Sequence, residues 1–314
     1  MIVVLAGGVG AARFLRGLVR VVPPSEVTVI GNTGDDIDIY GVHVSPDLDI
    51  VTFMLAGILD EQRQFGITGD THTLMAELAA TGQDTWFTLG DQDYAVCLAR
   101  TLLLEEGEPL HAATARIAER FGIGIRLIPM TDDLVFTTIR VHAPDGETDL
   151  HFQEYWVRHR AALPAIGVTL EGGGDSRPAP GVLDAIANAE AVIVAPSNPV
   201  VSIGTILAVP GIRDALRTTR APVVGVSPIV GGAVVRGMAD KLMPVVGAEV
   251  SARGAAGLYE DFLDGFVIDA VDSDARGSIE QLAVAVETTQ TMMHTPDDAA
   301  ALAKVALELA GRAR

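Results

Sequence analysis

Five of the six aspartates within the first sixty residues have the type and spacing expected of a metal site. Asp35 and Asp36 are adjacent, Asp47 and Asp49 are two positions apart, and Asp60 follows a further apolar stretch. Magnesium prefers oxygen ligands, usually one or two carboxylates together with phosphate oxygens. We therefore expect Asp49, Asp36 and Asp60 to hold Mg²⁺, and Asp49 and Asp36 to take part in catalysis.

Asp49 is the first of these candidates because it precedes the apolar run Ile50–Leu55. A carboxylate in such surroundings loses its hydration and tends to protonate unless it is paired or bound to a cation. Alternatively, Asp49 is a buried acid that accepts a hydrogen bond from a nearby backbone N–H. Capping explains Asp35 in a turn, and Asp47 before the helix expected near Leu48, without any metal.

A glycine-rich loop, Gly7–Arg13, follows the first apolar run. It lacks the Gly-Lys-Ser/Thr ending of a P-loop, and Arg13 stands where a dinucleotide fingerprint needs a small residue. Glycines allow the backbone to approach an anion, and a helix N-terminus stabilises its charge. We expect Gly7, Gly8 and Gly10 to contact a phosphate and Arg13 to reach it; otherwise these glycines only close a tight turn.

A second polar loop, Pro196–Gly204, follows the apolar strand expected at Ala191–Ala195. Its prolines restrict the backbone, and its hydroxyl and amide side chains offer hydrogen bonds. It is either a phosphate or base recognition loop or an ordinary turn between a strand and a helix. We expect a diphosphate to lie between the two loops, in contact with a set of polar side chains: Asn32, Ser197, Asn198 and Ser202.

Apolar strands alternate with helical stretches, which predicts a Rossmann-like α/β core with a parallel sheet. Ligands of such sheets bind beyond the carboxyl ends of the strands. The segment 131–181 alternates in hydrophobicity around Asp145-Gly146, so we expect a β-rich insertion within a single domain spanning residues 1–314. The other expected strands are Ile2–Leu5, Val27–Ile30 and Pro222–Val226.

Composition narrows the class of protein. The formal net charge is −19, which disfavours binding to nucleic acid or to an anionic membrane. The single cysteine, Cys97, permits no internal disulfide and is expected to be a small buried residue. No basic leader or uninterrupted apolar span is present, so we expect a cytoplasmic protein. The seven histidines are scattered, which disfavours a zinc site.

Taken together, these segments resemble the 2-phospho-L-lactate transferases, which complete the deazaflavin coenzyme called factor 420. The resemblance runs nearly from end to end. It is carried by Leu5–Leu15, Gly31–Asp36, Ser45–Asp49, Leu89–Asp93, Leu127–Asp133, His151–Trp156, Ala195–Gly204 and Val226–Gly232.

The resemblance implies a reaction, its cofactor and its partners. The ribityl hydroxyl of the deazaflavin alcohol, 7,8-didemethyl-8-hydroxy-5-deazariboflavin, attacks a guanosine-diphosphate-activated phospho-three-carbon acid, which is 2-phospho-L-lactate or phosphoenolpyruvate. GMP leaves, Mg²⁺ is required, and the enzyme is a homodimer. Asp49 matches a family position at the alcohol and metal, and Thr88 matches another alcohol contact. Gln92 stands where relatives often have arginine.

Two other classes fit less well. A nucleotide-sugar-binding regulator of the gluconeogenesis-factor type resembles the transferases in its glycine loops. It lacks segments like Pro46–Asp49 and His151–Trp156. A hydride-transferring dehydrogenase would need a ribose-binding acid after the second strand, where Gly31-Asn32 stands instead.

Overall fold

A computed structural model describes residues 1–312. Its centre is a seven-stranded sheet in the order β14-β13-β10-β9-β1-β2-β5, and every neighbouring pair is parallel. The strands are β1 (Ile2–Ala6), β2 (Val27–Gly31), β5 (Arg126–Pro129), β9 (Ala191–Val194), β10 (Val223–Val226), β13 (Gly265–Asp269) and β14 (Ala285–Thr289). The expected Rossmann-like parallel core is confirmed, and the four expected strands agree with β1, β2, β9 and β10 to within a residue at each end.

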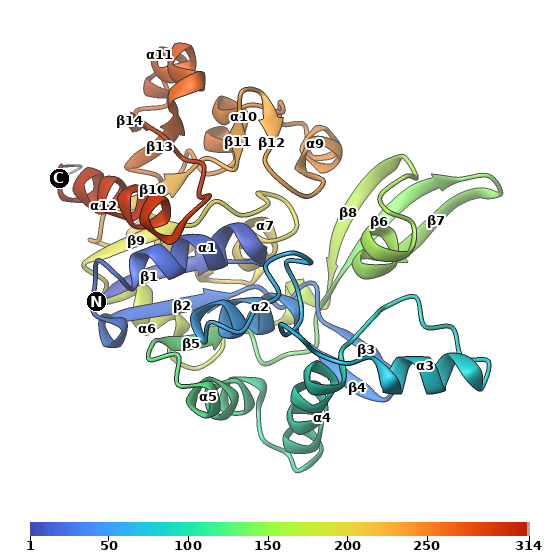
Figure 1. Cartoon of the computed structure of the whole chain (residues 1–314). Helices are drawn as coiled ribbons and strands as arrows, with labels where there is room; N and C mark the ends of the chain where they lie inside the picture. The colour runs from blue at the N-terminus through green and yellow to red at the C-terminus, as the bar shows by residue number, and fades with distance from the viewer. Residues whose placement is uncertain (313–314) are drawn as a thin grey trace.

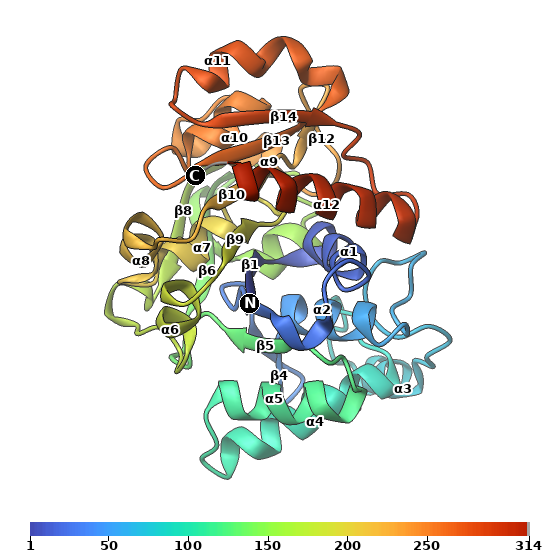
Figure 2. The ribbon, with the colours of Figure 1, turned by 90° about the vertical axis from the view of Figure 1, so that its left-hand side faces the viewer.

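Helices cover both faces of this sheet because the sheet residues alternate between two apolar cores. In β1, Val3 and Leu5 belong to one core, whereas Ile2 and Val4 belong to the other. On the second face α1 lies between α2 and α12 (Figure 2). Helices of this face are α1 (Gly8–Leu18), α2 (Pro46–Leu55) and α12 (Pro296–Arg312); those of the first are α6 (Val182–Ala187), α7 (Ile203–Ala208), α8 (Ile212–Thr218), α10 (Ala252–Gly257) and α11 (Arg276–Glu280).

The β-rich insertion is present as a three-stranded antiparallel sheet that projects from the core (Figure 1). Its strands are β6 (Phe136–Ala143), β7 (Gly146–His151) and β8 (Ala165–Glu171). The expected hairpin joins β6 to β7 across Pro144-Asp145. A π-helical turn, Glu154–Arg158, follows β7. The division of the whole chain into one domain stays a prediction.

A second excursion from the sheet lies between β2 and β5 and was not expected from the sequence. It contains a short hairpin and three helices, and the hairpin and the first two of these helices share a small core around the fully buried Cys97. The elements are β3 (Ile37–Ile39), β4 (Val42–Val44), α3 (Thr73–Ala80), α4 (Asp91–Glu105) and α5 (Leu110–Phe121). Farther along the chain lie β11 (Ile229–Val230), β12 (Ala233–Val234) and α9 (Ala239–Leu242).

Candidate functional site

A cavity of about 510 Å³ opens at the carboxyl ends of the sheet strands. Gly7 follows β1, Pro196 lies two residues after β9, and Ser227 follows β10; all three line it. Nine expected site residues line the same cavity: Gly7, Gly8, Gly10, Arg13, Asp49, Thr88, Ser197, Asn198 and Ser202. Three others, Asn32, Asp36 and Asp60, are not among its lining residues.

The first glycine loop packs directly against the second polar loop, as expected. The Gly7 amide donates to the Ser197 hydroxyl at 3.2 Å. A Cβ at Gly7 would lie 2.6 Å from Asp47 Oδ2 and 2.7 Å from the Ser202 Cβ, closer than real side chains approach. Gly8 adopts φ +72°, a left-handed conformation that favours glycine. Glycine at both positions therefore allows the loop to close while its backbone borders the cavity.

The second loop is held by its own side chains. Asn198 Oδ1 accepts from the amides of Val200, at 2.9 Å, and Val201, at 3.3 Å. Its backbone carbonyl accepts from the amides of Ser202 and Ile203. Asn198 therefore has a structural task in shaping this loop in addition to its place in the cavity wall.

Asn32 does not line the cavity itself but hydrogen-bonds residues that do. Its Nδ2 donates to Asp47 Oδ2 at 2.9 Å and to the Val201 carbonyl at 3.2 Å. Its Oδ1 accepts from the Gly34 amide at 2.8 Å and the Thr205 hydroxyl at 2.7 Å. The Asn32 amide is thus fully used, and it orients Asp47 and the second loop.

Two buried acids, Asp35 and Asp47, line the cavity. In the sequence, both could be explained as capping residues without a metal. Burial is the main reason that the pKa of Asp35 is raised well above its usual value, and the charge of Asp47 adds to it. Burial likewise raises the pKa of Asp47 to about 7, although the Asn32 side chain and the Gly8 amide oppose the shift. Oδ1 of Asp35 has no hydrogen-bond partner among residues 1–312. No cationic side chain among the described residues forms an ion pair with either acid or is a cause of either pKa shift.

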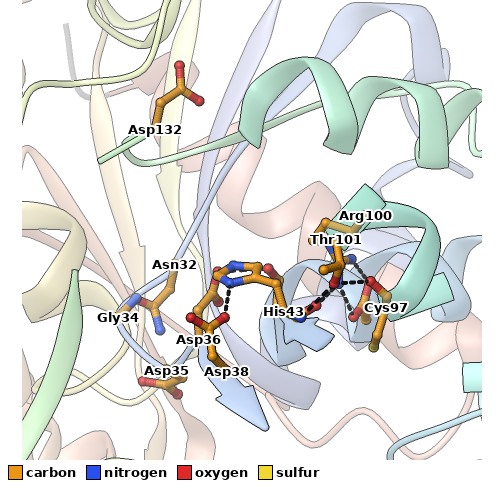
Figure 3. A network of polar contacts seen from close by, with 12 residues as sticks. Asn32, Gly34, Asp35, Asp36, Asp38, His43, Cys97, Arg100, Thr101 and Asp132 are labelled. Atoms are coloured by element: carbon orange, nitrogen blue, oxygen red, sulfur yellow. Dashed lines mark hydrogen bonds and ion pairs between the residues drawn. The ribbon is translucent and has the colours of Figure 1, made fainter. Parts of the chain in front are cut away.

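Asp36 does not line the cavity and is held by neighbouring side chains. Its Oδ2 accepts from the Ser45 hydroxyl at 2.7 Å and lies 3.2 Å from His43 Nε2, whose other nitrogen is 2.7 Å from Asp38 (Figure 3). Burial raises the pKa of Asp36, and the His43 contact lowers it. Its Oδ1 has no partner in the described part of the chain. Asp36 thus supports the loop that presents Asp35.

Asp49 forms a two-pronged ion pair with Arg100 of α4. Arg100 Nη1 donates to Asp49 Oδ2 at 3.1 Å, Nη2 donates to Oδ1, and Nη1 also reaches the His43 carbonyl at 3.3 Å. The side chains are 6% and 1% exposed, respectively. Burial opposes the charge of Arg100, but Asp49 raises its pKa overall. The desolvation that suggested a metal at Asp49 is therefore already compensated by a guanidinium.

Asp60 lies away from the cavity wall. Its Oδ1 accepts from the amides of Gln62, at 2.9 Å, and Arg63, at 3.1 Å. Its Oδ2 lies 3.8 Å from Arg63 Nε. The structure thus gives Asp60 a turn-capping task and does not bring it together with the other acids.

The segment that carries Thr88 is fixed by helix caps. Asp70 accepts from the amides of Gln92 and Asp93 at the start of α4, both at 3.0 Å. Asp91 in turn accepts from the Leu74 amide at 2.9 Å, at the start of α3. Asp93 lines the cavity, where burial, then the charges of Asp49 and Asp70, raise its pKa to about 7.

The segment His151–Trp156, which had no assigned task, reaches the cavity from the insertion. His151 Nε2 lies 3.0 Å from the Asp36 carbonyl, and Gln153 Nε2 donates to the Asp35 carbonyl at 3.0 Å. It thereby braces the acidic loop. The rings of Phe152 and Trp156 also line the cavity. Together with three other aromatic residues they form an apolar lining that we call the aromatic wall: Phe65, Trp86, Phe87, Phe152 and Trp156.

Sequence reasoning missed several lining residues because their neighbours in the chain give no sign of a site. Trp86 and Trp156 come from segments far apart in the chain. Arg236 belongs to the turn between β12 and α9. The sequence offered a signal for one of them, Trp156. It belongs to the segment His151–Trp156, which resembles the family although no turn, cap or apolar pattern explains its residues.

The fold and cavity define an α/β protein in which a glycine loop, buried acids and an aromatic wall meet at the ends of parallel strands. The model of the 2-phospho-L-lactate transferase CofD family matches residues 2–308. The chain belongs to this family. It is therefore a transferase, and the match supports a phosphotransferase role in coenzyme F420 biosynthesis.

Two relatives agree with this assignment, and one solved structure shares the fold. Proteins named phosphoenolpyruvate transferase from Streptomyces coelicolor and Streptomyces griseus are each 49% identical, over 315 and 316 residues, covering 100% of this chain and 99% of theirs. A UPF0052 family protein from Bacillus halodurans aligns with a TM-score of 0.63, 14% identity and 98% of both chains covered. The last likeness shows the fold alone. Among residues 1–312, no helix is long and apolar enough to cross a membrane.

Proposed function

We propose that this protein transfers a phospho-three-carbon acid from its guanosine-diphosphate-activated form to the terminal ribityl hydroxyl of the deazaflavin alcohol. One observation carries the proposal: a single cavity joins the glycine loop, the Asp35–Asp47 pair and the aromatic wall. The first two suit a diphosphate with a metal, and the third suits a flat ring system. The relatives named phosphoenolpyruvate transferase favour phosphoenolpyruvate over 2-phospho-L-lactate as the transferred acid.

In this reaction the hydroxyl oxygen attacks the phosphorus that carries the acid. A new P–O bond forms, the P–O bond to the GMP leaving group breaks, and the hydroxyl proton passes to a base. The amides of Val9 and Gly10, which lie in the first turn of α1 and line the cavity, are proposed to stabilise charge that develops on the phosphate oxygens. Asp49 and Thr88 line the cavity and are proposed to orient the attacking hydroxyl, while Arg100 holds the Asp49 carboxylate in place.

The proposed cofactor is Mg²⁺, and the residues fit it. Asp35 and Asp47 offer carboxylate oxygens at the cavity, and the unpartnered Asp35 Oδ1 is the donor that a hard cation requires. Asp36 supports them, whereas Asp49 already has its guanidinium and Asp60 lies elsewhere. When bound, the ion supplies positive charge to the diphosphate and its leaving group.

The test is incubation of the purified protein with the deazaflavin alcohol and each activated acid, with Mg²⁺ or with EDTA, followed by mass spectrometry. We expect product with Mg²⁺, little with EDTA, and faster turnover of the enolpyruvyl donor. Asp47→Asn should lower Mg²⁺ affinity, whereas Asp60→Asn, the matched control, should not. Absence of product from both donors would overturn the proposal. The homodimer implied by the family is a further part of it, and light scattering of the purified protein tests it.

A further inference from the structure

Two arginines line the cavity, and they come from opposite ends of the chain. Arg13 lies in α1, after the glycine loop, and Arg236 lies in the turn between β12 and α9. The turn is anchored on either side of Arg236. Val234 pairs with Ile229 in the β11–β12 hairpin, and Met238 is buried. The backbone of this turn is therefore held at the cavity.

Neither guanidinium has a partner in the part of the chain that the structure describes. Among residues 1–312, no hydrogen bond or ion pair involves Arg13 or Arg236. Arg16, one turn after Arg13, is by contrast paired with Glu61 at 2.7 Å. The chain has 41 acidic and 22 basic residues, so carboxylates for pairing are plentiful. Leaving two arginines unpaired at one cavity is therefore a property of this site.

The two like charges also disfavour one another. Burial, and then the positive charge of Arg13, lower the pKa of Arg236. An oxyanion placed against both guanidiniums would remove this repulsion and accept their N–H groups, because the planar fork of arginine matches carboxylate and phosphate oxygens.

We propose that Arg236, together with Arg13, forms a clamp for an oxyanion of the activated donor and that Arg236 determines donor binding. The proposal rests on the proposed function, which supplies a donor with two such anions, its carboxylate and its diphosphate. Both are bound by the same chemistry, and the measurements below separate them.

The experiment is calorimetry of GDP and of the activated enolpyruvyl donor, with Mg²⁺, on the full-length wild type and on Arg236→Ala, Arg236→Lys and Arg13→Ala. We expect Arg236→Ala to weaken donor binding by about tenfold or more, which corresponds to about 1.4 kcal/mol. Arg236→Lys keeps the charge but loses the fork, so it should be intermediate. Arg276→Ala is the matched control, because Arg276 is paired with Glu280 on α11 and is absent from the cavity lining.

The two ligands show which anion is held. Unchanged GDP binding with weakened donor binding assigns the clamp to the carboxylate, and equal loss for both assigns it to the diphosphate. Donor and GDP affinities of Arg236→Ala within twofold of wild type would overturn the clamp. A wild type that binds the donor without turnover would contradict the proposed function alone, whereas one that binds neither ligand would contradict both. Melting curves confirm that each variant is folded.

Discussion

The buried ion pair between Asp49 and Arg100 gives a prediction with a defined magnitude. Asp49→Asn keeps the shape of the side chain but leaves a guanidinium that is 1% exposed without its counter-charge. Removing one partner of a buried pair costs about 3–5 kcal/mol. Unfolding entropy of about 2.1 cal/mol/K per residue gives about 0.7 kcal/mol/K for this chain. We therefore expect Tm to fall by about 4–8 °C.

The assay is calorimetric or circular-dichroism melting, with a matched control. Asp149→Asn removes the same charge from another two-pronged arginine pair, but Arg140 and Asp149 are 57% and 48% exposed. Its Tm should stay within about 1 °C of wild type. The double variant Asp49→Leu/Arg100→Met should recover most of the loss, because apolar residues of similar size often replace a buried pair without cost. A shift below about 2 °C for Asp49→Asn would refute the reasoning.

Three further changes test other parts of the site. Gly7→Ala places a Cβ 2.6 Å from Asp47 Oδ2 and 2.7 Å from the Ser202 Cβ, so GDP affinity measured by calorimetry should fall by about tenfold or more; unchanged affinity would contradict this. The pKa of Asp93, raised to about 7 in the folded protein, lies above that of an unfolded aspartate, so its ionisation lowers stability as pH rises from about 4 to 7. Asp93→Asn should therefore raise Tm more at pH 8 than at pH 5, and an equal gain at both would argue against it. Asp70→Ala removes the acceptor for two amides of α4, and denaturant unfolding should show a free energy of unfolding lower by about 1–2 kcal/mol. Unaltered stability would show that Asp70 does not stabilise α4 as a cap.

The parallel core could be predicted because its strands are apolar runs that end in glycine or polar turns. Such patterns are local, and β1 and β9 followed them. The strand β13 and the edge strand β14 were not predicted because neither is followed directly by a glycine-bearing turn like those after β1 and β2. The structure of the segment between β2 and β5 was not predicted because its small core is built from residues distant in the sequence, with Cys97 at its centre.

The candidate site was predicted better in its loops than in its acids. The contact between Gly7 and Ser197 follows from strand order at one sheet edge. The tasks of the acids depend on tertiary partners: Arg100 lies 51 residues after Asp49, and no local pattern pairs them. By contrast, the capping of Gln62 and Arg63 amides by Asp60 is a local turn, which its own neighbours could have indicated.

Simultaneous measurement of both products tests the central claim most directly. Samples taken during turnover of the enolpyruvyl donor with the deazaflavin alcohol are analysed for GMP and for the deazaflavin phosphodiester by mass spectrometry. If the hydroxyl attacks the phosphorus that carries the acid, the two products form in equal amounts at every time point, and both require the alcohol. GMP that appears without phosphodiester, or a phosphodiester that contains the guanosine group, would contradict this account.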